Sequence, residues 1–361
     1  MKKLVTGALI FIMLIVSAVL YQLHQNMNIR QTQKAALILN GSSSDHSWNE
    51  AHTRGMKLAC ERLGVELTIR DNVPESSRSN AVMEELIKDG TSYIFCASFG
   101  YAPHVLEMAD KHPETKFFHC SGLNTRRNLT TYFARIYQMR YLAGIVAGLE
   151  TRNNRIGYVA SFPISEVNRG INAFTRGVRA VNPRAQVFVR WSNSWLEDTM
   201  NGRATEQLLQ TRQPDVLTLH TNSLEPLRLA DSLGVRTIGY NFEHTSLLPG
   251  SALTAAVWHW DKTYERFLSA AMQGSLAAGD FWDDCTTGAV GLSPLSDLVK
   301  PETRAAVERE QSRLMQGSWD VFNGPVRDTN GALRVPEGEN MPDSVLLQEF
   351  NWYVEGAVID E

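Results

Sequence analysis

Short apolar runs alternate with segments of helical periodicity along the chain from residue 34. Residues 35–39 form an unbroken apolar run, as in a buried strand, whereas 51–63 repeat apolar positions at the spacing of a helix. The same alternation predicts further strands at 65–70, 93–96, 116–120 and 130–134, and further helices at 79–88, 102–111 and 137–149. Strands that alternate with helices of this length predict a parallel sheet with helices on both faces.

The alternation restarts after a polar break at 151–154. We expect strands at 155–159, 186–191, 216–220, 236–240 and 252–257, and helices at 166–182, 197–209, 226–233 and 261–273. The remainder reads as an irregular β-rich segment at 279–291, a polar helix at 302–317, a hairpin-like pair of runs at 322–334 and a last apolar segment at 343–353. This repetition predicts two doubly wound, Rossmann-like α/β lobes joined by a hinge.

The expected lobe boundaries follow from this restart. We assign residues 34–152 plus about 253–280 to lobe 1, and 153–252 plus about 281–361 to lobe 2. The chain should cross between the lobes near 152–154, 249–252 and 279–287. A crevice between the strand ends of two such lobes is the natural place for a small ligand.

Residues 1–33 read as a targeting or anchoring segment with a linker. Lys2 and Lys3 precede an apolar run at 4–21, which either a cleaved signal peptide or an uncleaved membrane anchor would explain. The run continues past the small residues Val16, Ser17 and Ala18, which favours the anchor. Both interpretations place the rest of the chain on the extracytoplasmic face of the inner membrane.

Composition narrows the class of function. The 361 residues are 43% hydrophobic and 20% charged with a net charge of −4, so a packed core is expected and a nucleic-acid partner is disfavoured. The four cysteines do not have the spacing of a zinc site, and we expect no metal or cofactor. Cys96 and Cys120 end two successive strands, so they could form a disulfide, although buried thiols are the favoured alternative.

Catalytic motifs are absent from the sequence, which contains no G-x-S-x-G elbow, no H-E-x-x-H and no phosphate-binding lysine after Gly41. We therefore expect a binding protein rather than an enzyme. The strand-end loops are instead rich in aromatic and amide side chains, and Trp48 and Trp195, one from each lobe, could stack on the two faces of a flat heteroaromatic ring. The candidate ligand-binding residues are Asp45, Trp48, Asn49, Phe99, Gly100, Trp195, Asn222, Asn241 and Trp258.

Several of these segments occur together in one known family. The sequence contains Asp45-His46-Ser47-Trp48-Asn49, Tyr141-Leu142-Ala143-Gly144, Gly170-Ile171-Asn172-Ala173-Phe174, Val181-Asn182-Pro183, Met341-Pro342-Asp343 and Phe350-Asn351-Trp352-Tyr353-Val354-Glu355-Gly356. Over residues 34–361 the chain thereby resembles the BMP (basic membrane lipoprotein) family of type I periplasmic binding proteins, the purine-nucleoside receptors of ABC importers.

The resemblance implies roles for particular residues. Trp48 would stack on a purine, Asn49 would bond the base and Trp195 would supply the second stacking ring. The family's acidic ribose partner falls at Asn241 and its lysine falls near Trp258, and both replacements remove charge. The chain also has no cysteine before Cys60, so lipidation near its start is not expected.

The implied function is an extracytoplasmic solute-binding protein that captures a purine base or nucleoside between its lobes. The loss of charge favours a free base such as adenine. Its partner would be an ABC permease, and the inner membrane would be contacted through residues 4–21 if they are retained. The alternative is a membrane-tethered purine-sensing partner of a signalling receptor.

Overall fold

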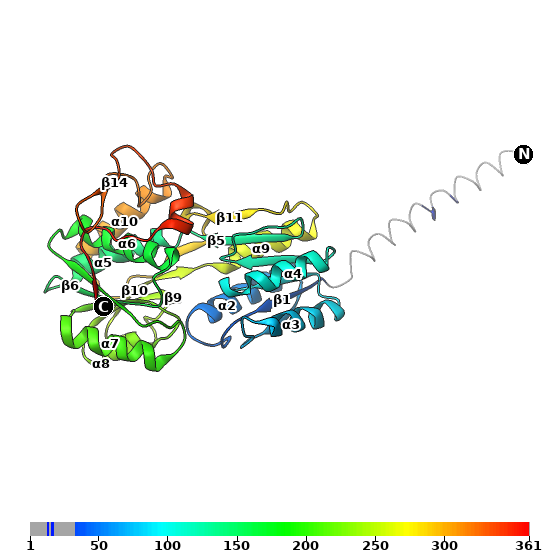
Figure 1. Ribbon diagram of the computed structural model, residues 1–361, viewed down its shortest axis with the longest axis horizontal. Coiled ribbons are helices and arrows are strands. Elements are labelled where there is room, and N and C mark those ends of the chain that lie inside the picture. The colour runs from blue at the N-terminus through cyan, green and yellow to red at the C-terminus, as the bar shows by residue number, and fades with distance from the viewer. Residues whose placement is uncertain (1–12, 14–15, 18–32, 361) are drawn as a thin grey trace, which may run out of the picture.

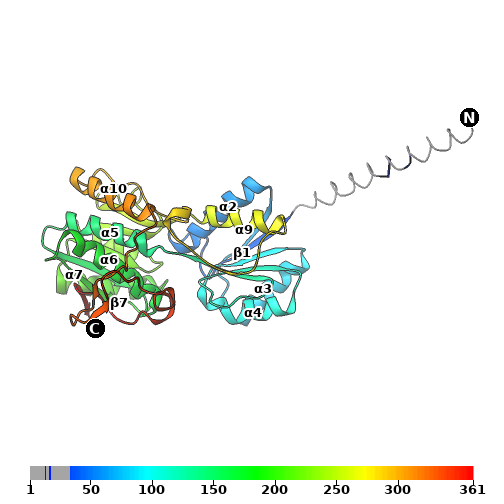
Figure 2. The same ribbon diagram turned by 90° about the horizontal axis from the view of Figure 1, so that it is seen from above.

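The computed structural model describes residues 13, 16–17 and 33–360. The expected signal or anchor at 4–21 and most of the 1–33 segment lie outside the described residues. Figure 1 shows two α/β lobes side by side, with α2, α3 and α4 in lobe 1 and α5 to α8 in lobe 2, and Figure 2 shows the segments that connect them. Among the described residues, no helix is both long and apolar enough to cross a bilayer.

Lobe 1 is a six-stranded parallel sheet in the order β11-β5-β4-β3-β1-β2. Helices α3 and α4 pack together, as do α2 and α9, and the two pairs cover opposite faces of the sheet (Figure 2). Its strands are β1 Lys34–Ile38, β2 Glu66–Arg70, β3 Tyr93–Cys96, β4 Lys116–Cys120, β5 Leu129–Ala134 and β11 Asp280–Asp283. Its helices are α2 Trp48–Leu63, α3 Ser77–Lys88, the 3-10 turn η1 Phe99–Tyr101, α4 Ala102–Lys111 and α9 Trp260–Met272.

Lobe 2 is a seven-stranded sheet in the order β12-β10-β9-β8-β6-β7-β15, in which only β12 is antiparallel to its neighbour. Its strands are β6 Arg155–Ala160, β7 Gln186–Trp191, β8 Val216–His220, β9 Arg236–Asn241, β10 Ala252–Trp258, β12 Val290–Leu292 and β15 Ala357–Asp360. Its helices are α5 Tyr137–Glu150, α6 Ser165–Val181, α7 Asp198–Arg212, α8 Glu225–Ser232, α10 Pro301–Met315, the 3-10 turn η2 Cys285–Thr287 and the π-helical turn η3 Val345–Glu349. A small hairpin of β13 Val326–Arg327 and β14 Leu333–Val335 lies outside this sheet.

The predicted fold class and the order of elements are confirmed, but the lobe boundaries need correction. Helix α5 packs on α6 of lobe 2, and β10 pairs with β9 of the same lobe, whereas α9 packs on α2 of lobe 1. The chain therefore crosses after β5 and after β10, not near 152 and 252, whereas the third crossing, after β11, lies where it was expected, near 279–287. The polar break at 151–154 is a turn inside lobe 2, which a single sequence cannot distinguish from a domain linker.

The contact between α5 and α6 is close because each helix presents a glycine to the other. A Cβ added at Gly144 would lie 2.0 Å from the Phe174 carbonyl oxygen, and one added at Gly177 would lie 2.0 Å from that of Tyr141. Both positions therefore exclude any side chain. This contact holds the C-terminal half of α6 against α5 in lobe 2.

Two further expectations are resolved by the structure. The four cysteines are buried free thiols, so the structure favours that alternative over the disulfide between Cys96 and Cys120. The expected segment at 343–353 contains only the short turn η3, and the final strand β15, which sequence analysis missed, extends the lobe 2 sheet beside β7.

Candidate functional site

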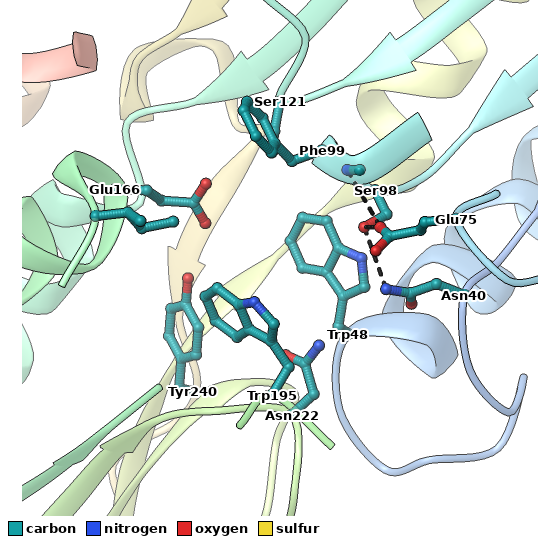
Figure 3. Close-up of a pocket in the computed structure, with 12 residues that line it drawn as sticks. Asn40, Trp48, Glu75, Ser98, Phe99, Ser121, Glu166, Trp195, Asn222 and Tyr240 are labelled. Atoms are coloured by element: carbon teal, nitrogen blue, oxygen red, sulfur yellow. Dashed lines mark hydrogen bonds between the residues drawn. The ribbon is translucent and has the colours of Figure 1, made fainter. Parts of the chain in front are cut away.

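A cavity of about 150 Å³ opens between the two lobes at the carboxyl ends of their strands. In both lobes the first strands have the order 2-1-3-4-5, read as β2-β1-β3-β4-β5 and β7-β6-β8-β9-β10. Loops that leave neighbouring strands in opposite directions create a crevice at such a switch point. The lining side chains project into it from both sides (Figure 3), and they belong to Asn40, Trp48, Glu75, Ser98, Phe99, Gly100, Ser121, Ile164, Glu166, Trp195, Asn222 and Tyr240.

Trp48, the first residue of α2, forms the wall on the side of lobe 1. Its Nε1 donates to the Ala97 carbonyl oxygen at 2.7 Å, and only 8% of the residue is exposed. The ring packs edge-on against His52, Trp258 and Trp260 at centroid distances of 4.4, 5.6 and 5.7 Å. Its orientation is therefore fixed by a buried hydrogen bond and by an aromatic cluster behind it.

Trp195 forms the facing wall on the side of lobe 2 (Figure 3). It follows β7 in a loop that is held by backbone contacts, because the Asn222 amide donates to the Trp195 carbonyl oxygen at 2.8 Å. The half-buried indole has Phe162 and His220 as aromatic neighbours, at 6.0 and 6.1 Å. Burial lowers the pKa of His220, which packs beneath the cavity as a neutral core residue.

Asp45 and Asn49 shape the loop rather than line the cavity. The Asp45 carboxylate accepts from the backbone amides of Ser47, Asn49 and Glu50 at 2.8, 3.0 and 2.9 Å, and from Asn49 Nδ2 at 2.9 Å. Burial raises the pKa of Asp45, although these hydrogen bonds act in the opposite direction. Asn49 is fully buried beside Gly41, so the structure places its side chain behind the loop that presents Trp48.

Asn241 and Trp258 also lie behind the lining. Asn241 Nδ2 donates to Ser47 Oγ of lobe 1 and to Asn222 Oδ1, each at 3.1 Å, and its Oδ1 accepts from Trp258 Nε1 at 2.9 Å. Asn241 therefore connects Ser47 of lobe 1 to Asn222 of lobe 2, and Asn222 does line the cavity. Phe99 and Gly100 line the cavity as expected, so five of the nine candidates, Trp48, Phe99, Gly100, Trp195 and Asn222, meet there.

Two carboxylates line the cavity, and its lining contains no lysine, arginine or histidine. On the side of lobe 1, Glu75 accepts from Ser98 Oγ and from the Gly100 amide, and Asn40 Nδ2 donates to Ser98 Oγ at 3.1 Å. On the side of lobe 2, Glu166 points into the cavity near the hydroxyl of Tyr240 (Figure 3). The site is thus a slot between two indoles with negative charge at its edges, which suits an uncharged ring that carries hydrogen-bond donors.

Comparison with known proteins places the chain in a family. The family described as ABC transporter substrate-binding protein PnrA-like (Bmp) matches residues 32–321. The chain belongs to this family. It is 31% identical over 326 residues to a purine-binding protein of Brucella abortus, a match that covers 90% of this chain and 92% of that one. It is 33% identical over 327 residues, 91% of this chain and 81% of the other, to a Haloferax volcanii protein whose name describes an ABC transporter glucose-binding protein.

Solved structures agree on the fold of this PnrA-like chain. A solute-binding protein of an ABC transporter from Aeropyrum pernix matches with a TM-score of 0.70 and 16% identity, over 88% of this chain and 98% of that one. A transcriptional activator of the comK gene from Bacillus halodurans also gives 0.70, with 21% identity over 80% of this chain and 99% of that one. The two-lobed fold therefore occurs in proteins with different outputs.

Sequence analysis of this PnrA-like protein missed the two carboxylates and Tyr240. Glu75 lies in the loop after β2, and Glu166 lies in the first turn of α6, both at carboxyl ends of strands. Their position at strand ends could have identified both carboxylates as lining residues. They were missed because uncharged aromatic and amide residues were favoured as candidates in these loops. Among the described residues, no group of three or more histidine, cysteine, aspartate or glutamate side chains could hold a metal ion.

Proposed function

We propose that this substrate-binding protein captures a purine base between its lobes for an ABC importer on the extracytoplasmic side of the membrane. The observation that carries the proposal is the pair of indoles, Trp48 and Trp195, which face one cavity from opposite lobes. Stacking of a nucleobase on an aromatic side chain contributes about 1–3 kcal/mol per base. The purine-binding relative in Brucella abortus supports the same ligand class.

The polar lining supports an uncharged base over a nucleotide. Glu75 and Glu166 would repel a phosphate, and the lining offers no cation to compensate that repulsion. The same carboxylates accept hydrogen bonds from N–H groups, which every free purine presents on its ring edges. The cavity volume of about 150 Å³ matches that of a cavity that holds a ring the size of benzene, so a compact ligand is favoured.

A monosaccharide is the second candidate, because the Haloferax volcanii relative is named for glucose binding. Sugars also stack on indoles, and their hydroxyl groups donate hydrogen bonds to carboxylates. A signalling role, the alternative from the sequence, depended on the run at 4–21, outside the described residues. The family is one of ABC transporter substrate-binding proteins, which favours import.

Isothermal titration calorimetry with adenine, guanine, hypoxanthine, adenosine and glucose tests the proposal. We expect at least one free purine base to bind more than a hundredfold more tightly than glucose. A thermal-shift series offers a second readout, because a ligand at a hundredfold excess over its Kd stabilises the folded state by about 2.7 kcal/mol. Tight glucose binding without purine binding would contradict the purine proposal and identify a sugar as the ligand.

A further inference from the structure

The Glu166 carboxylate lines the cavity without a hydrogen-bond or ion-pair partner in the described part of the protein. Among the described residues, no group donates a hydrogen bond to it and no cation forms an ion pair with it. The nearest candidate is Arg169 on the same helix, but Arg169 donates to the Leu346 carbonyl oxygen and stacks over Trp282 at 5.1 Å. Burial raises the pKa of Glu166, and the charge of Arg169 opposes that rise.

An acidic residue in the first turn of a helix commonly stabilises the helix through a favourable interaction with its dipole, and Glu166 has that position in α6. That role does not require the carboxylate to project into a cleft. Figure 3 shows Glu166 directed between the indole of Trp195 and the side chain of Phe99, with the Tyr240 hydroxyl beside it. An acceptor placed there in a half-buried environment is stabilised by a donor that a ligand brings.

Glu166 also stands at the boundary of a second cavity. This cavity of about 270 Å³ shares Phe99, Ser121, Ile164 and Glu166 with the first, and continues toward Phe133 and Trp282. Its other walls combine apolar side chains with the polar side chains of Ser165, Arg169, Asp280 and Gln348. A ligand that extends from the slot between the indoles into this second cavity therefore passes the Glu166 carboxylate.

We propose that Glu166 accepts the imidazole N–H of a free purine base and thereby selects free bases over N9-substituted nucleosides. The inference rests on the proposed purine ligand. Adenine carries donors at opposite ends, its amino group and its imidazole N–H, and the cavity has carboxylates from opposite lobes, Glu75 and Glu166. Attachment of ribose at N9 removes the second donor, leaves Glu166 without a partner and directs the sugar past it.

The test measures Kd by calorimetry for adenine and 9-methyladenine with the wild type, Glu166→Gln and Glu75→Gln. Glutamine keeps the shape of the side chain but loses its charge. We expect Glu166→Gln to weaken adenine at least tenfold, equivalent to about 1.4 kcal/mol. We also expect the penalty for the N9 methyl group to shrink more than threefold in Glu166→Gln relative to the wild type. Glu302→Gln, an exposed first-turn acid of α10 remote from the cavity, is the matched control and should leave both constants unchanged.

The outcomes separate this inference from the proposed function. In one outcome, the wild type binds adenine while the loss of affinity caused by the N9 methyl group stays the same in Glu166→Gln or shrinks by threefold or less. That result overturns the role of Glu166 and leaves the purine proposal standing. A reduced penalty in Glu75→Gln alone would assign the imidazole edge to lobe 1 and likewise overturn it. The absence of any purine binding to the wild type contradicts the proposed function itself. Thermal melting of the apo variants confirms that each is folded.

Discussion

Replacement of Trp195 by alanine is the sharpest test of the two-indole slot, because it removes a ligand-facing ring with little damage to the fold. The backbone bond from Asn222 and the bond from the Glu197 amide to Ser194 Oγ do not involve the indole. A half-buried ring costs less to remove than a buried one, for which about 3–5 kcal/mol is typical. Trp48 is less suitable, since its Nε1 bond to Ala97 and its aromatic neighbours tie it to the core.

The expected loss follows from stacking. About 1–3 kcal/mol per base corresponds to a roughly 5- to 150-fold rise in the Kd for adenine. Calorimetry at 25 °C measures it, and Trp195→Phe should recover part of the affinity because it restores an aromatic face. Trp191→Ala, a half-buried tryptophan of β7 outside the cavity lining, is the matched control. A Kd for Trp195→Ala within twofold of the wild type, in a protein that melts as a folded domain, would refute the stacking model.

Three further predictions concern stability and the contact between lobes. Burial lowers the pKa of His119 and of His244 to about 4, so as pH falls below about 6.5 the unfolded state binds their protons first. The two together should lower the unfolding free energy by about 4 kcal/mol between pH 7.5 and pH 5. The loss from them should continue as pH falls through 4 and level off near pH 3, and urea denaturation of His119→Gln should show a smaller decline. Gly177→Ala should destabilise by about 1–3 kcal/mol because its methyl group would meet the Tyr141 carbonyl, whereas Gly202→Ala, with its nearest atom at 3.4 Å, should be neutral or stabilising in the same denaturation assay. Asn241→Ala should raise the ligand Kd by roughly fivefold, about 1 kcal/mol, by breaking the link between Ser47 and Asn222, and an unaltered Kd in calorimetry would contradict that role.

Periodicity was sufficient to predict the order of the elements, because most strands here are continuous apolar runs and most helices are amphipathic. It could not predict which strand joins which sheet. Strand β10 at Ala252–Trp258 looks like a new start after Pro249 and Gly250, yet it pairs with β9 and completes lobe 2. Strand order depends on contacts between distant residues, and a single sequence does not report them. The short strand β15 was missed because its four residues follow an irregular segment rather than a periodic helix.

The site divides in a similar way. Trp48, Trp195 and Asn222 could be predicted because position after a strand and aromatic or amide chemistry coincide. Asp45 was predicted as a ligand residue, but the structure places it outside the cavity lining, where it accepts from its own loop. An aspartate two residues before a helix N-cap typically closes such a turn. The sequence contained that signal. The direction of the Glu166 side chain, by contrast, depends on how α6 is placed beside the cavity, which only the assembled lobe shows.

The division of the lining between lobes explains how occupancy could control closure. A ligand shifts a conformational equilibrium only by its difference in affinity for the two states. In an open form a base on Trp48 keeps its contacts with lobe 1 and loses Trp195 and Glu166. Stacking of about 1–3 kcal/mol and a hydrogen bond to a charged group of about 1.5–3 kcal/mol together approach the roughly 5.5 kcal/mol that moves an equilibrium from 1:99 to 99:1. The direct bonds between lobes, Asn241 to Ser47 and His244 to the His46 carbonyl, each 3.1 Å, favour the closed form without ligand. The proposed contacts of a base with Trp195 and Glu166 would add to them and so couple binding to closure.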